Sequence, residues 1–253
     1  MRLNRNWLSA YTWACEGRYL LFHLLVVLCF VYPIEYLHIE LKCSTIFNLR
    51  ILLPQGRPIG DTLLAFLPTV GDALVLSLPL LLFTRRRWVV FIPLFLFDLF
   101  GLAQSCYARV YEDVMPYSSF LLFDNVNGVL LNSVRGLLRW RDVTLFVPTL
   151  LLLAAYLLYF GKQRSYPSTR TRWITAAVSL VIALAAYGGR SYQIYHRESA
   201  DRESPWTAFI TPYNYREYLI YHGVVPYTGY VLVSSLVQSD ELTADERATV
   251  DNY

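Results

Sequence analysis

The chain has 253 residues, of which 55% are hydrophobic and 16% aromatic, and its mean hydropathy is +0.36. Only 16% of the residues are charged, against about 25% in soluble domains. This composition excludes an ordinary soluble protein and indicates an integral membrane protein. The net charge of +3, without a basic stripe interleaved with aromatic residues, argues against nucleic acid as a partner.

Five apolar segments are long enough, or nearly so, to cross a bilayer as helices, which takes about 17–25 residues. They cover residues 19–39, 61–83, 88–106, 143–160 and 173–188. Tyr and Trp residues near several of their ends fit the aromatic belt at a membrane surface. We therefore predict an all-α integral membrane protein with about five transmembrane helices. The first apolar run has no small-residue cleavage site, so it is interpreted as an uncleaved spanning helix.

The distribution of Lys and Arg predicts the orientation in the membrane. Basic residues in 1–18, 85–87 and 161–172 are about three times as dense as on the opposite side. Because basic loops tend to stay in the cytoplasm, the N-terminus is predicted to be cytoplasmic and the C-terminus extracytoplasmic. This gives a transmembrane domain over 1–188 and an extracytoplasmic connector over 189–253.

The predicted outer segments contain amphipathic helices. Residues 116–140 are apolar but interrupted by Asp, Asn and Arg, which favours a segment lying in the outer interface. A sixth crossing is the alternative, although this density of polar residues is costly in hydrocarbon. In the tail, one short helix is predicted to end at Gly223 and another to begin near Pro226.

Two acidic residues lie within predicted spans, where charged groups are costly. Asp72 occurs in "PTVGDALVLSLPL" and Asp98 in "FIPLFLFDLFGL", each near the middle of its span. Because these consecutive spans are antiparallel, the two carboxyl groups are predicted at nearly the same depth. They predict an intramembrane polar site for a head group, a cation or a proton. The alternative is that each Asp only hydrogen-bonds a neighbouring group and holds two helices together.

Three charged residues follow the third span directly: Arg109, Glu112 and Asp113, in "ARVYEDVMPYSS". We expect them to contact a lipid head group or a partner domain at the outer interface, and simple solvated charge is the alternative. The sequence contains none of the common hydrolase, zinc-protease or nucleotide-binding motifs. None of its four cysteines is spaced as in a metal site. The sequence therefore predicts no catalytic residue and no metal ligand in this segment.

Three stretches resemble the lipoteichoic acid synthase-like, sulfatase-type membrane phosphotransferases, a group related to the phosphoethanolamine transferases of the bacterial envelope. "GDALVL" and "FDLFGLAQSCYARVYEDV" look like the family's membrane Asp positions and the Arg and acidic stretch that follow. "YREYLIYHGVVPYTGYVLVSSLVQSDELTADERATVDNY" is similar to the connector that precedes the family's catalytic domain.

The resemblance implies a domain of the bacterial inner (cytoplasmic) membrane that presents a phospholipid and docks a C-terminal catalytic domain. In the family, that domain is of the alkaline-phosphatase type, with a Thr nucleophile and a divalent metal ion. It transfers a phosphorylated alcohol from a phospholipid to an envelope acceptor. It lies outside this sequence, so no catalytic residue, cofactor or metal ligand is carried over to any position here.

The last residues also predict that the chain is part of a longer protein. Thr243 and Glu246 have the spacing of a capping box at the start of a helix. A complete small protein is the alternative. Two other functions stay open: a transporter or carrier that uses Asp72 and Asp98, and a non-catalytic membrane scaffold. The absence of an inverted repeat argues against the carrier.

Overall fold

The computed structural model of the chain describes residues 5–41, 59–83, 87–115, 136–160, 168–194 and 215–240. Within these ranges every regular element is helical and no strand occurs. The first half contains α1 (Arg5–Glu40), α3 (Ile59–Phe83), η1 (Arg87–Val90) and α4 (Phe91–Tyr111). The second half contains η3 (Trp140–Phe146), α7 (Val147–Ala155), η4 (Tyr156–Phe160), α8 (Thr169–Gln193), α10 (Tyr215–His222) and α11 (Val224–Asp240).

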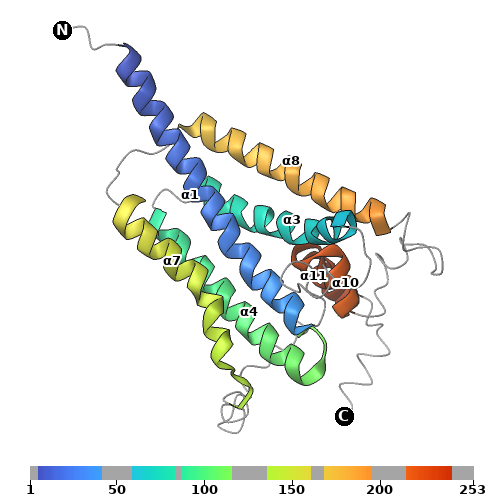
Figure 1. The fold of residues 1–253 in the computed structure, drawn as a ribbon. Coiled ribbons are helices and arrows are strands. Elements are labelled where there is room, and N and C mark those ends of the chain that lie inside the picture. The colour runs from blue at the N-terminus through green and yellow to red at the C-terminus, as the bar shows by residue number, and fades with distance from the viewer. Residues whose placement is uncertain are drawn as a thin grey trace.

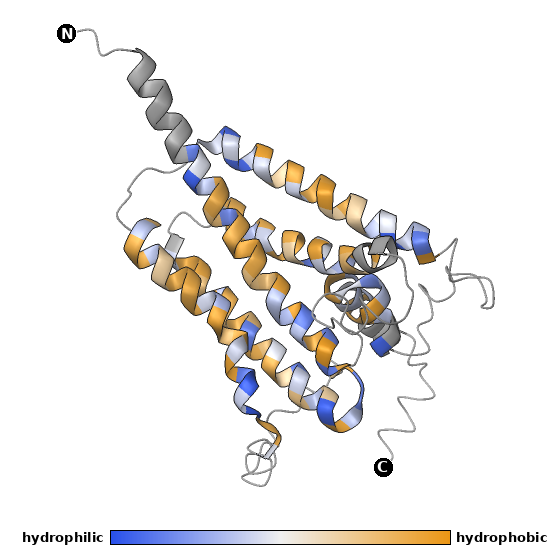
Figure 2. Ribbon diagram, in the orientation of Figure 1, coloured by the Kyte–Doolittle hydropathy of each residue, from blue (hydrophilic) through white to orange (hydrophobic). Residues whose placement is uncertain are grey.

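The predicted membrane fold is confirmed. In the described part of the chain, five helical segments are long and apolar enough to cross a membrane. They are Glu16–Glu40, Leu64–Leu82, Trp88–Tyr111, Trp140–Phe160 and Thr169–Gln193. The middle of each segment is mostly apolar, and polar residues gather toward the ends (Figure 2). Which side of the membrane each end faces stays a prediction.

Several helices extend beyond the predicted spans. α4 continues past 106 to Tyr111, and α8 continues past 188 to Gln193. Hydropathy does not mark the last turn of α8 because Arg190 and Gln193 are polar, yet both are buried against other parts of the protein. Packing therefore extends the helix beyond the apolar run.

The long helices run side by side and alternate in direction (Figure 1). As a result, the C-terminal ends of α1, α4 and α8 lie at the same end of the bundle as the start of η3 (Figure 1). We call this the Glu40 end, after the last residue of α1. The short helices α10 and α11 pack at this end against α3 and α8.

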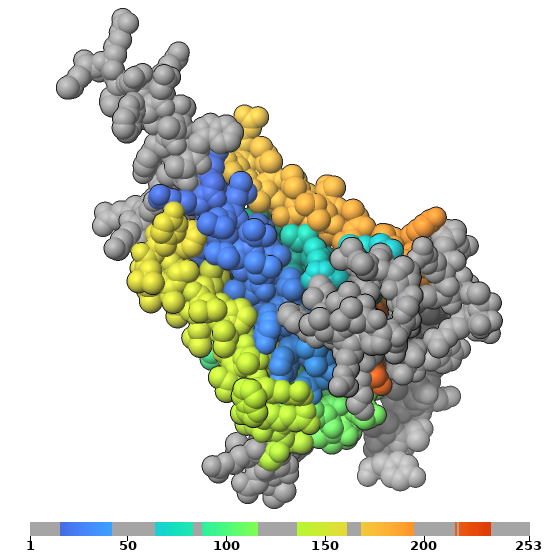
Figure 3. All heavy atoms as spheres, viewed as in Figure 1, coloured from blue at the N-terminus to red at the C-terminus, as the bar shows by residue number. Residues whose placement is uncertain are grey.

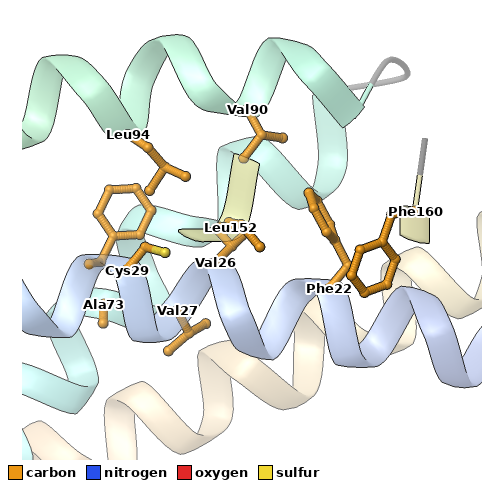
Figure 4. Packing of buried hydrophobic residues seen from close by; sticks show 10 residues of the cluster. Phe22, Val26, Val27, Cys29, Ala73, Val90, Leu94, Leu152 and Phe160 are labelled. Atoms are coloured by element: carbon orange, nitrogen blue, oxygen red, sulfur yellow. The ribbon is translucent and has the colours of Figure 1, made fainter. Parts of the chain in front are cut away.

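The larger apolar core joins α1, α3, α4 and α7. Phe22 and Val26 of α1 meet Leu94 of α4 and Leu152 of α7 inside the bundle (Figure 4). Burying such side chains contributes about 1.5–3 kcal/mol each in water, whereas helix association in lipid depends more on close packing. α1 and α7 lie side by side along the visible face of the bundle (Figure 3).

A second apolar cluster attaches α10 and α11 to the bundle. Tyr218 and Leu219 of α10 and Tyr227 of α11 are buried against Ile34 of α1 and Ala108 of α4. The predicted C-terminal glycine of the first tail helix is confirmed, because α10 ends at His222 and Gly223 has a φ of +100°. The two helices therefore form a hairpin packed into the bundle, which we call the α10–α11 hairpin.

Candidate functional site

The first polar centre lies at the Glu40 end, where three of the candidate spans end or begin. α1 contributes Glu40, α4 contributes Arg109 in its last turn, and η3 contributes Asp142. Residues so far apart in sequence meet because consecutive helices of the chain run in opposite directions, which brings the ends of α1 and α4 together with the start of η3 (Figure 1). The whole group, here called the Arg109 network, consists of Tyr36, Glu40, Arg109, Arg139, Arg141 and Asp142.

Arg109 is the buried centre of this network, with only 4% of its side chain exposed. Its Nε donates to Glu40 Oε2 at 2.8 Å and its Nη1 to Asp142 Oδ2 at 2.8 Å. Nη1 also donates to the carbonyl of Leu137, and Nη2 donates to Asp142 Oδ1 and to the Tyr36 hydroxyl. Every nitrogen of the guanidinium group is therefore committed to protein acceptors.

The other two arginines of the network are much more exposed. Arg141 Nη2 donates to Glu40 Oε1 at 2.5 Å, while 40% of the Arg141 side chain stays exposed. Arg139 Nη1 lies 3.7 Å from Glu40 Oε2, with 52% of its side chain exposed. Together with Arg109, three guanidinium groups face the two carboxylates of Glu40 and Asp142. This part of the network therefore has an excess of one positive charge.

The second polar centre is formed by Asp72 of α3, which is fully buried. Its Oδ2 accepts the N–H of Val224 at 2.5 Å, and its Oδ1 accepts the N–H of Val225 at 3.0 Å. The Tyr187 hydroxyl of α8 donates to Oδ1 at 2.6 Å. Asp72 thus caps the N-terminus of α11 from another helix, where free N–H groups and the helix dipole favour a carboxylate. We call this arrangement the Asp72 cap.

Two glycines make the Asp72 cap possible. A Cβ atom at Gly223 would lie 2.6 Å from Asp72 Oδ2, and its φ of +100° is strained for any other residue. A Cβ atom at Gly71 would lie 2.9 Å from the ring of Tyr187. Both positions therefore need glycine for the carboxylate, the phenol ring and the start of α11 to meet.

The cap lies below the helix ends and not at the surface of the bundle. Tyr187 is about six residues, or roughly 9 Å, before the end of α8 at Gln193. One turn before Asp72 on α3, the hydroxyl of Thr69 donates to Glu35 Oε1 at 2.7 Å, and His38 Nδ1 lies 3.5 Å from the same oxygen. The N-terminus of α11 therefore lies beside a buried polar layer.

Asp98, the other predicted intramembrane acid, lies elsewhere in the bundle. It is buried in α4 beside Thr149 of α7. Its Oδ2 atom has no hydrogen-bond partner among the described residues. The described contacts of Asp72 and Asp98 share no residue, so the structure does not bring the two acids into one site.

The predicted cluster after the third span is divided by the structure. Arg109 points into the buried network, whereas Glu112 is exposed at the end of α4 with a φ of 53°. Asp113 Oδ1 accepts the N–H of its neighbour Val114 at 2.8 Å. The role predicted for these three residues as a head-group or domain contact stays a prediction.

A smaller cluster lies beside the hairpin. The guanidinium group of Arg190 stacks on Tyr221 at 5.3 Å from the ring centroid and donates to Gln193 Oε1 at 2.6 Å. Arg190, Tyr221 and His222 are among the residues that line a small pocket. Burial, together with the nearby charge of Arg190, lowers the pKa of His222 to about 4.

Within the described ranges, no group of three or more His, Cys, Asp or Glu residues has the arrangement of a metal site. The polar centres described above can pair charges, cap a helix and bind anions. In each centre a tyrosine hydroxyl donates to a carboxylate whose other contacts are protein donors, an arrangement that fits a structural role.

Sequence analysis did not single out Glu35, Glu40, Asp142 or Tyr187. A usable signal existed for Glu40 and Asp142, because each lies next to the end of an apolar run on the same predicted side as Arg109. Opposite charges at such neighbouring ends favour an ion pair. No comparable signal marked Tyr187, since it is one of 20 tyrosines in the chain.

A comparison with known protein families gives one match over most of the chain. The family described as lipoteichoic acid synthase N-terminal domain matches residues 14–239. The matched range contains all five candidate spans, both polar centres and the hairpin up to Ser239. No curated protein and no solved structure matches the chain.

Proposed function

This chain belongs to the family of lipoteichoic acid synthase N-terminal domains, and we propose that it anchors and positions the catalytic part of a membrane phosphotransferase. The proposed enzyme moves a phosphorylated alcohol from a phospholipid to an envelope acceptor. In that step the bond between phosphorus and the diacylglycerol oxygen breaks, and a bond to the acceptor oxygen forms. The acceptor hydroxyl loses its proton, and the released diacylglycerol gains one.

The Asp72 cap is the observation that carries this proposal. It ties the N-terminus of α11 to two helices of the bundle through three hydrogen bonds. The α10–α11 hairpin adds an apolar attachment through Tyr218, Leu219 and Tyr227. A segment that leads toward a following domain would therefore leave the membrane from a fixed position. A fixed exit is useful because a misplacement of about 1 Å can slow an enzyme about 100-fold.

The same geometry favours anchoring over a carrier function. A carrier needs a site that releases its cargo, and such a site must have ligand atoms that solvent or cargo can reach. Both oxygens of Asp72 are instead occupied by protein donors, and its side chain is fully buried. Asp72 is thus better suited to hold helices together than to bind a transported ion.

The proposed location is the bacterial cytoplasmic membrane, with the N-terminus in the cytoplasm and the Glu40 end outside. The support is the distribution of basic residues: Arg18, Arg170 and Arg172 belong to the end opposite Glu40. In this orientation the hairpin, the Arg109 network and the proposed catalytic domain, which is expected to use a divalent metal ion, all face the outer leaflet.

The proposal is tested with the intact enzyme that contains this chain, reconstituted in vesicles whose phospholipid is labelled in the head group. We expect transfer of the label to a water-soluble or lipid-linked acceptor, with release of diacylglycerol. Gly223→Ala should slow the transfer, because either the Asp72 carboxylate or the turn before α11 has to move. Gly229→Ala is the matched control, since Gly229 is exposed and a Cβ atom there meets nothing within 4 Å. A wild-type enzyme that releases no diacylglycerol would refute the proposed function.

A further inference from the structure

Three arginines lie at the depth where the apolar spans end, but they are not equivalent. Arg109 is buried, and all its nitrogens donate to protein acceptors. Arg139 and Arg141 have 52% and 40% of their side chains exposed. If the Glu40 end contacts a head group, the available guanidinium groups are therefore those of Arg139 and Arg141.

Both exposed arginines retain unused hydrogen-bond donors. Arg141 donates one side-chain hydrogen bond within the described residues, from Nη2 to Glu40, and 40% of its side chain is exposed. Arg139 approaches Glu40 only at 3.7 Å. A guanidinium group has five N–H donors in a planar fork that matches the oxygens of a phosphate. The two groups share Glu40 as a neighbour, so they lie close to each other.

The apolar side chains beside them fit a lipid better than a free anion. Trp140, between the two arginines, is 87% exposed, and Leu138 and Val143 are 47% and 65% exposed. The candidate span that contains Arg141 begins at Trp140. A Trp at the start of a span, flanked by cations, is typical of the head-group level of a membrane. Acyl chains can cover these apolar side chains, whereas inorganic phosphate cannot.

We propose that Arg139 and Arg141 form a binding site for the phosphodiester group of an anionic phospholipid, with Trp140 against the glycerol and acyl region. This inference rests on the proposed lipid-presenting function and assigns its lipid contact to two residues that sequence analysis did not select. Glu40 positions both guanidinium groups, while Arg109 and Asp142 hold Glu40 and the start of η3 in place. The excess positive charge of the network favours an anionic lipid over a zwitterionic one.

The test measures lipid binding by the full chain in a neutral detergent, using native mass spectrometry. The probes are dihexanoyl phosphatidylmethanol, whose only charge is its phosphodiester, dihexanoyl phosphatidylcholine, and inorganic phosphate. The variants are Arg139→Gln, Arg141→Gln and the double variant. Arg170→Gln is the matched control, because Arg170 is an exposed arginine near the exposed Trp173 at the opposite end of the bundle.

We expect each single substitution to weaken binding of phosphatidylmethanol about fivefold and the double variant about 30-fold, at roughly 1 kcal/mol per arginine. Arg170→Gln should leave binding unchanged, and phosphatidylcholine should bind more weakly than phosphatidylmethanol. Arg139→Lys should retain more affinity than Arg139→Gln, since the charge stays and only the planar fork is lost. If the double variant is unstable, Arg139→Gln alone decides, because within the described residues the Arg139 side chain has only the 3.7 Å contact with Glu40 to lose.

Three results would overturn this assignment. The first is equal binding by the wild type and Arg139→Gln, and the second is an equal loss in Arg170→Gln. Displacement of the lipid by inorganic phosphate would show a phosphate site and would likewise refute a lipid site. Because this assay involves no turnover, its failure leaves the phosphotransferase proposal intact. Conversely, an enzyme without transferase activity whose lipid binding depends on Arg139 would refute only the proposed function.

Discussion

At the Arg109 network buried charges meet opposite charges, whereas at the Asp72 cap a buried carboxylate meets hydrogen-bond donors without charge. Arg109 joins Glu40 and Asp142 through ion pairs. Asp72 accepts two backbone N–H groups and one phenol hydroxyl. The first arrangement connects the ends of three long helices, and the second connects a short hairpin to the bundle.

This difference indicates which part of the molecule is more easily displaced. Removing one partner of a buried ion pair is costly, because it leaves an uncompensated charge away from water. A helix cap contributes only about 0.5–2 kcal/mol. We therefore expect the long helices to stay together under conditions in which the α10–α11 hairpin already detaches. Each prediction below changes one side of this comparison.

The largest effect is expected from Arg109→Gln. The substitution leaves Glu40 and Asp142 buried without the cation that joins them, which should cost about 3–5 kcal/mol. The free energy of unfolding, measured by titration of the detergent-solubilised chain with sodium dodecyl sulfate, checks this value. Arg170→Gln, at an exposed position in α8, should have almost no effect. A loss below about 1 kcal/mol for Arg109→Gln would show that the network does not hold the helix ends together.

The next largest effect is expected at Gly223. An alanine there has to adopt a φ of +100° with its Cβ 2.6 Å from Asp72 Oδ2, so either the carboxylate or the turn has to move. Backbone strain alone costs about 1–3 kcal/mol. Hydrogen exchange of α11 amides should accelerate in Gly223→Ala, while exchange in α1 and α4 stays unchanged. In contrast, Gly229→Ala should slow exchange in α11, since alanine is favoured over glycine inside a helix by about 1 kcal/mol.

The sequence predicted the fold well because membrane thickness limits the length of each apolar run. All five predicted spans overlap helices of the structure, and the turn at Gly223 was predicted from residue type alone. Helix ends were predicted less well, because polar residues such as Arg190 and Gln193 continue the helix while buried. The predicted interfacial segment over 116–140 lies mostly outside the described residues, so it stays a prediction.

The polar centres could be predicted only in part. Burial of Asp72 and Asp98 was expected from the cost of an acid in the membrane, and both are buried. Their partners were not predictable, because the contacts of Asp72 are long-range, from α3 to α8 and α11. Arg109 was singled out from its position after the third span. Its direction into the bundle depends on Glu40 and Asp142, which only the folded arrangement brings together.

Tyr187→Phe should weaken the Asp72 cap more mildly. It removes the hydroxyl that donates to Asp72 Oδ1 at 2.6 Å, while the ring can keep its place against Gly71. A hydrogen bond to a carboxylate contributes about 1.5 kcal/mol, so exchange in α11 should accelerate about tenfold. Tyr111→Phe is the control, since Tyr111 is 64% exposed. Unchanged exchange in Tyr187→Phe would mean that the backbone donors of α11 hold Asp72 on their own.

The smallest effect concerns the pH dependence of the hairpin. In the docked hairpin, burial and the charge of Arg190 lower the pKa of His222 to about 4, below the ordinary value of about 6.5. A detached hairpin therefore binds the proton more readily, so docking is strongest above about pH 6.5 and weakens as the pH falls toward about 4. Between pH 7 and about pH 5.5 the loss should be about 1 kcal/mol. Hydrogen exchange of α10 and α11 over this pH range measures the loss after correction for the intrinsic pH dependence of exchange.

His222→Asn should abolish this pH dependence, because asparagine does not titrate. If the full pH effect persists in His222→Asn, it originates in another titrating group. The ion-paired helix ends around Arg109 should show no such pH dependence in the wild type or in His222→Asn.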